Sequence, residues 1–148
     1  MDDNYFMNEA LYLAKTAYTH GEIPVGAIIV KDNIIIAGAY NEKDNSGLVT
    51  KHAELIAIEK ASKTLKDWRL NDCTIYVTLE PCPMCASAIQ QSRFKRLVYG
   101  CKSNIVDNYD IICKILQNEN YNHRVIVDGL VLEKPCSKII KDFFKSKR

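Results

Sequence analysis

Two short motifs carry residue types that bind metals and move protons. The first is His52-Ala53-Glu54, and the second is Pro81-Cys82-Pro83-Met84-Cys85. Each fragment alone occurs often by chance, but histidine nitrogen and cysteine sulfur are ligands that zinc prefers. The spacing of Cys82 and Cys85 puts both sulfurs on one side of a first helical turn. Together the two motifs predict a zinc site with three protein ligands, His52, Cys82 and Cys85.

Glu54 lies two residues beyond His52, and we expect it to move protons rather than to ligate the metal. A catalytic zinc keeps one position open to water and lowers the pKa of that water from about 15.7 to near 7. A nearby carboxylate can take the proton of the water and can then protonate first a ring nitrogen and next the leaving amine, so one carboxylate can shuttle protons throughout. The pairing of H-x-E with P-C-x-x-C is typical of zinc deaminases, which release ammonia from a nucleobase. The prediction is a hydrolytic deaminase with one Zn²⁺ per subunit.

Two other interpretations of the cysteines fit the sequence less well. A closed structural zinc site needs a fourth ligand, and the plausible donors, Cys73 and His123, lack the usual spacing. A redox C-x-x-C pair would leave His52-Ala53-Glu54 without a role. The chain is too long to need disulfides for stability, so we expect the remaining cysteines to be buried thiols.

Hydrophobic periodicity predicts the elements that must position these motifs. Helices are expected over 4–19, 51–65, 83–92, 109–116 and 135–145, and strands over 25–30, 34–39, 74–79, 96–100 and 125–127. Thr50 is the expected N-cap of the second helix, and Pro81 and Pro83 suit the start of the third. Strands that alternate with helices after an opening hairpin predict a mixed sheet with helices on both faces.

Composition limits the class of protein. The 148 residues are 47% hydrophobic and 26% charged, which fits one soluble domain, residues 1–148. No apolar run approaches the roughly 18 to 20 residues that span a bilayer, so no membrane partner is expected. The acidic, polar start lacks the features of a signal peptide, and the expected location is the cytoplasm. The net charge of +2 does not by itself indicate nucleic-acid binding, but the segment from Lys138 onward is strongly basic.

The sequence resembles the bacterial tRNA-specific adenosine deaminases, of the cytidine/deoxycytidylate deaminase superfamily, over nearly its whole length. Besides His52-Ala53-Glu54, the resemblance rests on residues 22–27, Asn41, residues 76–85, Ser92-Arg93, residues 122–125 and residues 142–144. It implies a cytidine-deaminase-like fold, a three-layer α/β/α sandwich around a five-stranded mixed sheet. The implied reaction converts adenosine to inosine at the wobble position of a tRNA anticodon. The implied partners are the tRNA anticodon loop and a second copy of the chain, a homodimer with active sites near its interface.

The resemblance also implies four substrate contacts. Asn41 would hydrogen-bond the flipped nucleoside and Val25 would line its pocket, while Arg93 and Phe144 would lie near the substrate path. Taken alone, Asn41 is typical of a turn, Val25 of a core and Arg93 of a surface ion pair. The residue types therefore leave these roles open.

Two segments depart from the family pattern, and both bear on substrate choice rather than on zinc. Leu48-Val49-Thr50-Lys51 replaces an Asp-Pro-Thr-Ala-type run, and residues 103–109 contain no glycine where the family has a glycine-rich loop. Two alternative functions therefore stay open. One is a deaminase of a free nucleobase, guanine or cytosine, and the other is a non-catalytic, zinc-stabilised RNA-binding subunit.

Overall fold

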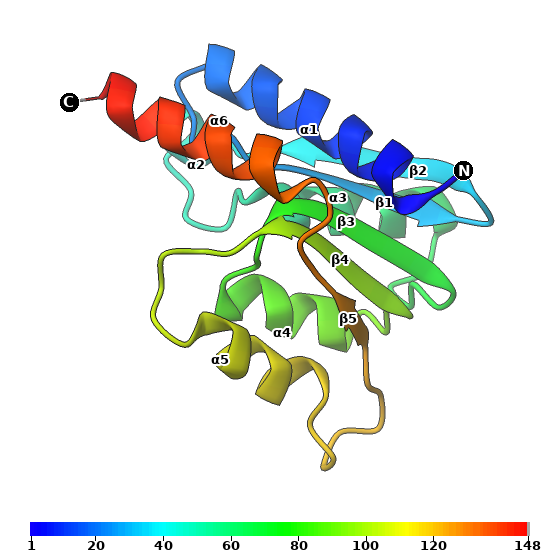
Figure 1. Cartoon of the computed structure of the whole chain (residues 1–148). Helices are drawn as coiled ribbons and strands as arrows, with labels where there is room; N and C mark the ends of the chain where they lie inside the picture. The colour runs from blue at the N-terminus through cyan, green and yellow to red at the C-terminus, as the bar shows by residue number, and fades with distance from the viewer. Residues whose placement is uncertain (148) are drawn as a thin grey trace.

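The computed structural model describes residues 1–147, and its centre is an open five-stranded sheet in the order β2-β1-β3-β4-β5 (Figure 1). Strand β1 pairs antiparallel with β2 and β3, whereas β3, β4 and β5 run parallel, so the sheet is mixed as predicted. The strands are β1 (Gly26–Lys31), β2 (Ile34–Tyr40), β3 (Cys73–Leu79), β4 (Arg96–Cys101) and β5 (Ile126–Asp128). The helices are α1 (Asp3–Thr19), α2 (Lys43–Ser46), α3 (Ala53–Leu65), α4 (Pro83–Gln91), α5 (Asn108–Leu116) and α6 (Glu133–Ser146).

Helices cover both faces of the sheet and form the three predicted layers. Helices α1 and α6 lie on one face, and α3, α4 and α5 lie on the other (Figure 1). Alternate residues of β1 explain the division, because Ile28 faces the α1 side and Ile29 faces the α3 side. The three-layer α/β/α sandwich is confirmed.

The hairpin of β1 and β2 forms through a two-residue turn. Asp32 and Asn33 both have positive φ, 52° and 63°, and short polar side chains tolerate that conformation. The hairpin places the start of β1 beside the end of β2, and the antiparallel pairing of β1 with β3 places it beside the end of β3, where the two zinc motifs approach each other.

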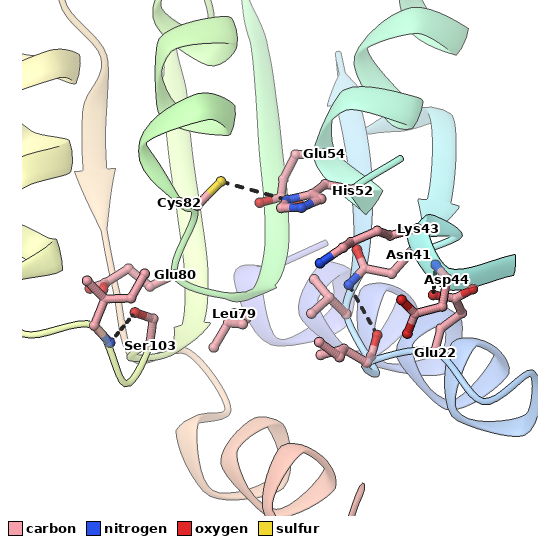
Figure 2. A pocket seen from close by; sticks show the side chains of 13 residues that line it. Glu22, Asn41, Lys43, Asp44, His52, Glu54, Leu79, Glu80, Cys82 and Ser103 are labelled. Atoms are coloured by element: carbon pink, nitrogen blue, oxygen red, sulfur yellow. Dashed lines mark hydrogen bonds between the residues drawn. The ribbon is translucent and has the colours of Figure 1, made fainter. Parts of the chain in front are cut away.

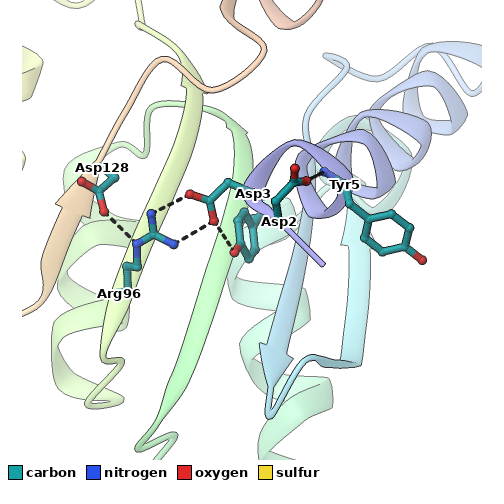
Figure 3. Close-up of polar contacts among 6 residues, drawn as sticks. Asp2, Asp3, Tyr5, Arg96 and Asp128 are labelled. Carbon is teal, nitrogen blue, oxygen red and sulfur yellow. Dashed lines mark hydrogen bonds and ion pairs between the residues drawn. The ribbon is translucent and has the colours of Figure 1, made fainter.

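A polar network joins the first helix to the middle of the sheet (Figure 3). The Arg96 guanidinium donates to both carboxylate oxygens of Asp3, at 2.8 and 2.7 Å, and to Asp128 at 2.7 Å. The Tyr76 hydroxyl donates to Asp3 at 2.7 Å. Asp2 precedes this network and caps α1 by accepting from the Tyr5 backbone N–H. The N-terminal helix is therefore fixed to β3, β4 and β5.

The largest departure of the structure from the predicted elements lies between β2 and α3. The short helix α2 was not predicted, and α3 begins at Ala53 rather than near Lys51. The N-cap of α3 is His52, not Thr50, and its side chain makes no cap hydrogen bond. None of the helices within residues 1–147 is long and apolar enough to cross a membrane. Arg148, the end of the basic segment, lies outside the described residues.

Candidate functional site

The structure brings the three predicted metal ligands together. The Nδ1 atom of His52 lies 3.4 Å from Cys85 Sγ and 3.7 Å from Cys82 Sγ, and all three ligand atoms lie within 4.8 Å of one another. Zinc–sulfur and zinc–nitrogen bonds on a tetrahedron place neighbouring ligand atoms about 3.6 Å apart. The nitrogen and sulfur donors and their spacing therefore fit a zinc ion, and the zinc cofactor follows from this set.

Two helix N-termini supply the ligands. His52 is the N-cap of α3, Cys82 is the N-cap of α4, and Cys85 lies in the first turn of α4. The positive ends of both helices favour thiolates at this point. Hydrogen bonds from Cys85 and then from His52 lower the pKa of Cys82 to about 4. The pKa of Cys85 is raised because its proton is shared with Cys82, and binding of a metal cation releases such a proton.

Glu54 lies in the first turn of α3, beside the metal ligands. Its side chain is 3% exposed, and it does not belong to the metal-binding group. Burial raises the pKa of Glu54 to about 7. A carboxyl group with a pKa near neutrality can both accept and donate a proton, as a deamination requires.

These groups form the floor of a cavity of about 200 Å³ (Figure 2). His52, Glu54 and Cys82 line it, and apolar walls come from Val25, Leu79 and other aliphatic residues. A small apolar cavity with a few convergent polar groups is typical of a site for a planar heterocycle.

Two of the four predicted substrate contacts lie in this cavity, namely Val25 and Asn41. The Asn41 amide donates to the Ile23 carbonyl at 3.2 Å, and its oxygen accepts from the Ala53 backbone N–H at 2.8 Å. Asn41 therefore caps α3 as well as lining the cavity. The other amide N–H of Asn41 makes no hydrogen bond within the described residues and is available to a ligand.

Arg93 does not reach the cavity within its own chain. It follows the C-terminal end of α4, whereas Cys82 precedes the N-terminal end, and the nine-residue helix is about 13 Å long. The Arg93 guanidinium lies 5.8 Å from the ring centroid of Trp68, and its backbone has a positive φ of 67°.

Phe144 lies in a separate groove of about 700 Å³ along α6. Lys102, Lys141 and two lysines near the end of α6 line this groove. Asn104 lines the groove, while its neighbours Ser103 and Ile105 line the cavity. The loop after β4 thus separates the cavity from the basic groove.

Sequence reasoning missed four charged residues of the cavity, Glu22, Lys43, Asp44 and Glu80. Glu22 is buried and accepts from the backbone N–H groups of Asp44 and Asn45 at 3.0 and 2.7 Å. It therefore anchors α2, from which Lys43 extends to the cavity (Figure 2). The one available signal was that Glu22 and Glu80 lie in stretches that resemble the deaminases.

The candidate fourth ligands do not join the metal site. His123 Nε2 lies 2.6 Å from the Phe94 carbonyl oxygen, and Cys73 is buried at the start of β3. Among residues 1–147, no other group of histidine, cysteine and acidic side chains comes close enough to bind a metal. The donor set is therefore the three-ligand set of an open site rather than a closed one.

The α/β/α fold and the three-ligand site beside a buried glutamate define a zinc-dependent hydrolytic deaminase. Residues 1–101 match the cytidine and deoxycytidylate deaminase zinc-binding region, and the chain belongs to that family. A tRNA-specific adenosine deaminase of Buchnera aphidicola is 43% identical over 148 residues, which cover 99% of this chain and 90% of that protein.

Two solved structures extend the comparison. A structure from work on A-to-I editing by tRNA:A34 deaminases at the wobble position matches with a TM-score of 0.83 and 34% identity, over 91% of this chain and 98% of that one. A guanine deaminase of Bacillus subtilis matches with a TM-score of 0.66 and 42% identity, over 69% of this chain and 66% of that one.

Proposed function

We propose that this protein deaminates adenosine to inosine at the wobble position of a tRNA anticodon. The observation that carries the proposal is the buried Glu54 beside the three-ligand metal group at the floor of a cavity for one base. Support for the substrate comes from the tRNA-specific deaminase of Buchnera aphidicola, whose similarity covers 99% of this chain. The match to the guanine deaminase covers only 69%. A tRNA substrate also implies a cytoplasmic location.

The residues of the cavity account for the steps that a deamination needs. His52, Cys82 and Cys85 would hold the zinc ion, which supplies an acidified water when bound. Glu54 would take one proton from that water and pass it to the ring nitrogen, and would then carry the second proton, from the hydroxyl on the attacked carbon, to the leaving amine. Val25 packs against the base, and the free N–H of Asn41 donates to a ring acceptor. These are proposed roles for each residue.

The groove beside the cavity suits the backbone of an RNA strand. Its lysines, Lys102, Lys141, Lys145 and Lys147, offer positive charge for phosphates, and Phe144 offers an aromatic face that is 43% exposed. Phosphate contacts position an RNA, and aromatic side chains stack on unpaired bases such as those of an anticodon loop. We therefore propose that the anticodon loop enters along α6 and places its target base in the cavity.

The remaining predicted contact, Arg93, fits the proposal only if the enzyme is a homodimer. Arg93 is too far from the cavity of its own chain, so it would have to reach the substrate of a second subunit. Sedimentation equilibrium tests the dimer. Mixing inactive Glu54→Ala and Arg93→Ala subunits tests the shared site, because mixed dimers would regain one intact site in two. A monomer, or no regained activity, would refute this arrangement.

Incubation of the purified enzyme with total tRNA, followed by sequencing, tests the substrate. Inosine is read as guanosine, so one anticodon position should change from adenosine to guanosine. Ammonia release from free guanine or cytosine, with no change in tRNA, would establish the second candidate, a free-base deaminase. The similarity to guanine deaminase is the observation that supports this second candidate. Full function of Glu54→Ala would establish the third, a non-catalytic RNA-binding subunit.

A further inference from the structure

A third buried carboxylate of the cavity, Glu80, lies on the opposite side from Glu22 and has no assigned role (Figure 2). Its side chain is 3% exposed and makes no ion pair within the described residues. Its one hydrogen-bond donor is the side-chain amide of Asn108, at 2.7 Å from Oε1. Asn108 is itself 1% exposed and is the first residue of α5.

This hydrogen bond joins two loops that form the cavity. The same Asn108 nitrogen donates to the carbonyl of Pro81 at 3.0 Å, directly before the metal ligand Cys82. The Asn108 backbone N–H donates to the Ile105 carbonyl, and the Glu80 N–H donates to the Cys101 carbonyl. Asn108 thus holds both the peptide before Cys82 and the loop over 102–107, which contributes Ser103 and Ile105 to the cavity wall.

The pairing of Glu80 with Asn108 is not the arrangement that would stabilise the fold most. Glu80 Oε2 and Asn108 Oδ1 are both buried and have no hydrogen-bond partner within the protein. Each buried unpaired acceptor costs about 1–3 kcal/mol, and apolar side chains of similar shape would avoid that cost. Such features concentrate where a structure serves a function rather than its own stability.

The loop over 102–107 has no glycine, so a residue with a side chain must take its left-handed conformation, and the Asn108 contact helps to hold the loop in that shape. Asp107 has a positive φ of 58°, which costs energy for a residue with a side chain. Ile105 and Val106 are 53% and 80% exposed, so little apolar burial holds the tip of the loop. Asn108 is therefore the main anchor between this loop and the metal-ligand loop.

We propose that Glu80 and Asn108 are a positioning pair, which sets the distance between the cavity wall at Ser103 and Ile105 and the metal ligand Cys82. Neither residue takes part in the chemical step. The pair fixes how closely the wall confines the base above the metal, and its effect on turnover rests on the proposed function. A misplacement of about 1 Å at such a wall can cost up to about 100-fold in rate.

The experiment compares the zinc-loaded wild type with Asn108→Ala, Glu80→Ala, the double variant and Glu80→Gln. The control is Asn120→Ala, on an exposed asparagine in the loop after α5. Measurements are kcat and KM for tRNA, zinc content, and amide hydrogen exchange over residues 101–110. We expect each alanine variant to lose about 10- to 100-fold in kcat/KM, mainly through kcat, and to exchange faster in this loop. Zinc content should stay at one per chain.

The double variant and Glu80→Gln test whether the hydrogen bond between Glu80 and Asn108 is what positions the loop. If this hydrogen bond carries the effect, the double variant should lose no more kcat/KM than either single alanine variant. Glu80→Gln keeps an oxygen for Asn108, so it should retain kcat/KM to within about threefold of wild type. Additive losses, a Glu80→Gln variant as impaired as Glu80→Ala, or unchanged loop exchange would overturn the proposal. A wild type that is inactive on tRNA would refute the proposed function. Amide hydrogen exchange over the loop would still test whether the Glu80–Asn108 hydrogen bond holds it.

Discussion

At the scale of single residues, the catalytic character of Glu54 comes from where the chain buries it. It lies in the first turn of α3, 3% exposed, next to two sulfurs that carry negative charge once they bind metal. Burial favours the protonated carboxyl and therefore raises the pKa of Glu54 to about 7. A solvent-exposed glutamate in the same sequence position would be a weaker proton acceptor.

Replacement of Glu54 by Gln should abolish turnover while zinc stays bound. The amide keeps the size of the side chain but cannot carry the proton, and general acid–base catalysis contributes about 10²- to 10⁴-fold or more. Zinc content by elemental analysis and inosine formation in tRNA are the two measurements. Because Gln also removes a buried ionisable group, the thermal midpoint should not fall. Activity within tenfold of wild type would refute the role of Glu54.

Cys82→Ser should lose zinc and destabilise the fold. A hydroxyl is a far weaker zinc ligand than a thiolate, and zinc binding contributes to folding free energy. Elemental analysis and thermal unfolding with and without chelator measure both effects. The chelator should lower the melting temperature of wild type and leave that of Cys82→Ser unchanged. Cys113→Ser, at a half-buried thiol outside the metal group, is the control and should bind zinc normally.

At the scale of elements, the start of α3 depends on a residue from outside the helix. Asn41 follows β2, and its side-chain oxygen accepts from the first N–H of α3, at Ala53. The usual capping position is held by His52, whose ring serves the metal instead. His52 is therefore free to bind the metal, because Asn41, directly after β2, caps α3 in its place.

Asn41→Ala should cost about 1–2 kcal/mol of stability, since it removes this cap. Asn41→Asp keeps the accepting oxygen and should lose less stability, although both variants should lose activity because neither donates to a base. Urea unfolding gives the stability difference, and kcat/KM for tRNA gives the activity. Equal stability of the Ala and Asp variants would show that the cap does not hold α3.

The same region shows what could be predicted from the sequence and what could not. Strong local patterns were enough for β1, β3 and α4, whose observed bounds lie within about one residue of the predicted ones. The zinc ligands were also predictable, because metal chemistry restricts residue types and spacing. Helix α2 was not, because its anchor is Glu22, more than 20 residues earlier in the chain. Glu80 was missed for the same reason, since its partner Asn108 is distant in sequence.

At the scale of the whole molecule, one ion-pair network fastens the first helix to the sheet. The Arg96 guanidinium holds the pKa of Asp3 below its usual range, and the Tyr76 hydroxyl lowers it further. A carboxyl whose pKa is lowered in the folded state adds stability above its unfolded pKa. That contribution is lost as the pH falls through the folded pKa.

Asp3→Asn should therefore lower stability at pH 7 and make little difference well below pH 4. We expect a loss of about 1 kcal/mol, because the pair is about one-third exposed and solvent screens it. Thermal unfolding between pH 3 and pH 7 is the measurement. Glu59→Gln, in the exposed pair with Lys63, is the control and should change stability little at any pH. A loss that is equal at pH 3 and pH 7 would contradict the role of the Asp3 charge.

The long separation between His52 and its partners also governs the order in which the protein can assemble during synthesis. The β1–β2 hairpin is local and can pair as soon as it emerges, but Cys82 and Cys85 follow His52 by 30 and 33 residues. At about 5–20 residues per second, these thiols appear seconds after the histidine. During that interval His52 is the one metal ligand of the three that has been synthesised. Binding of a metal by all three ligands must therefore wait until Cys85 has emerged, by which time the β1–β2 hairpin has had time to pair.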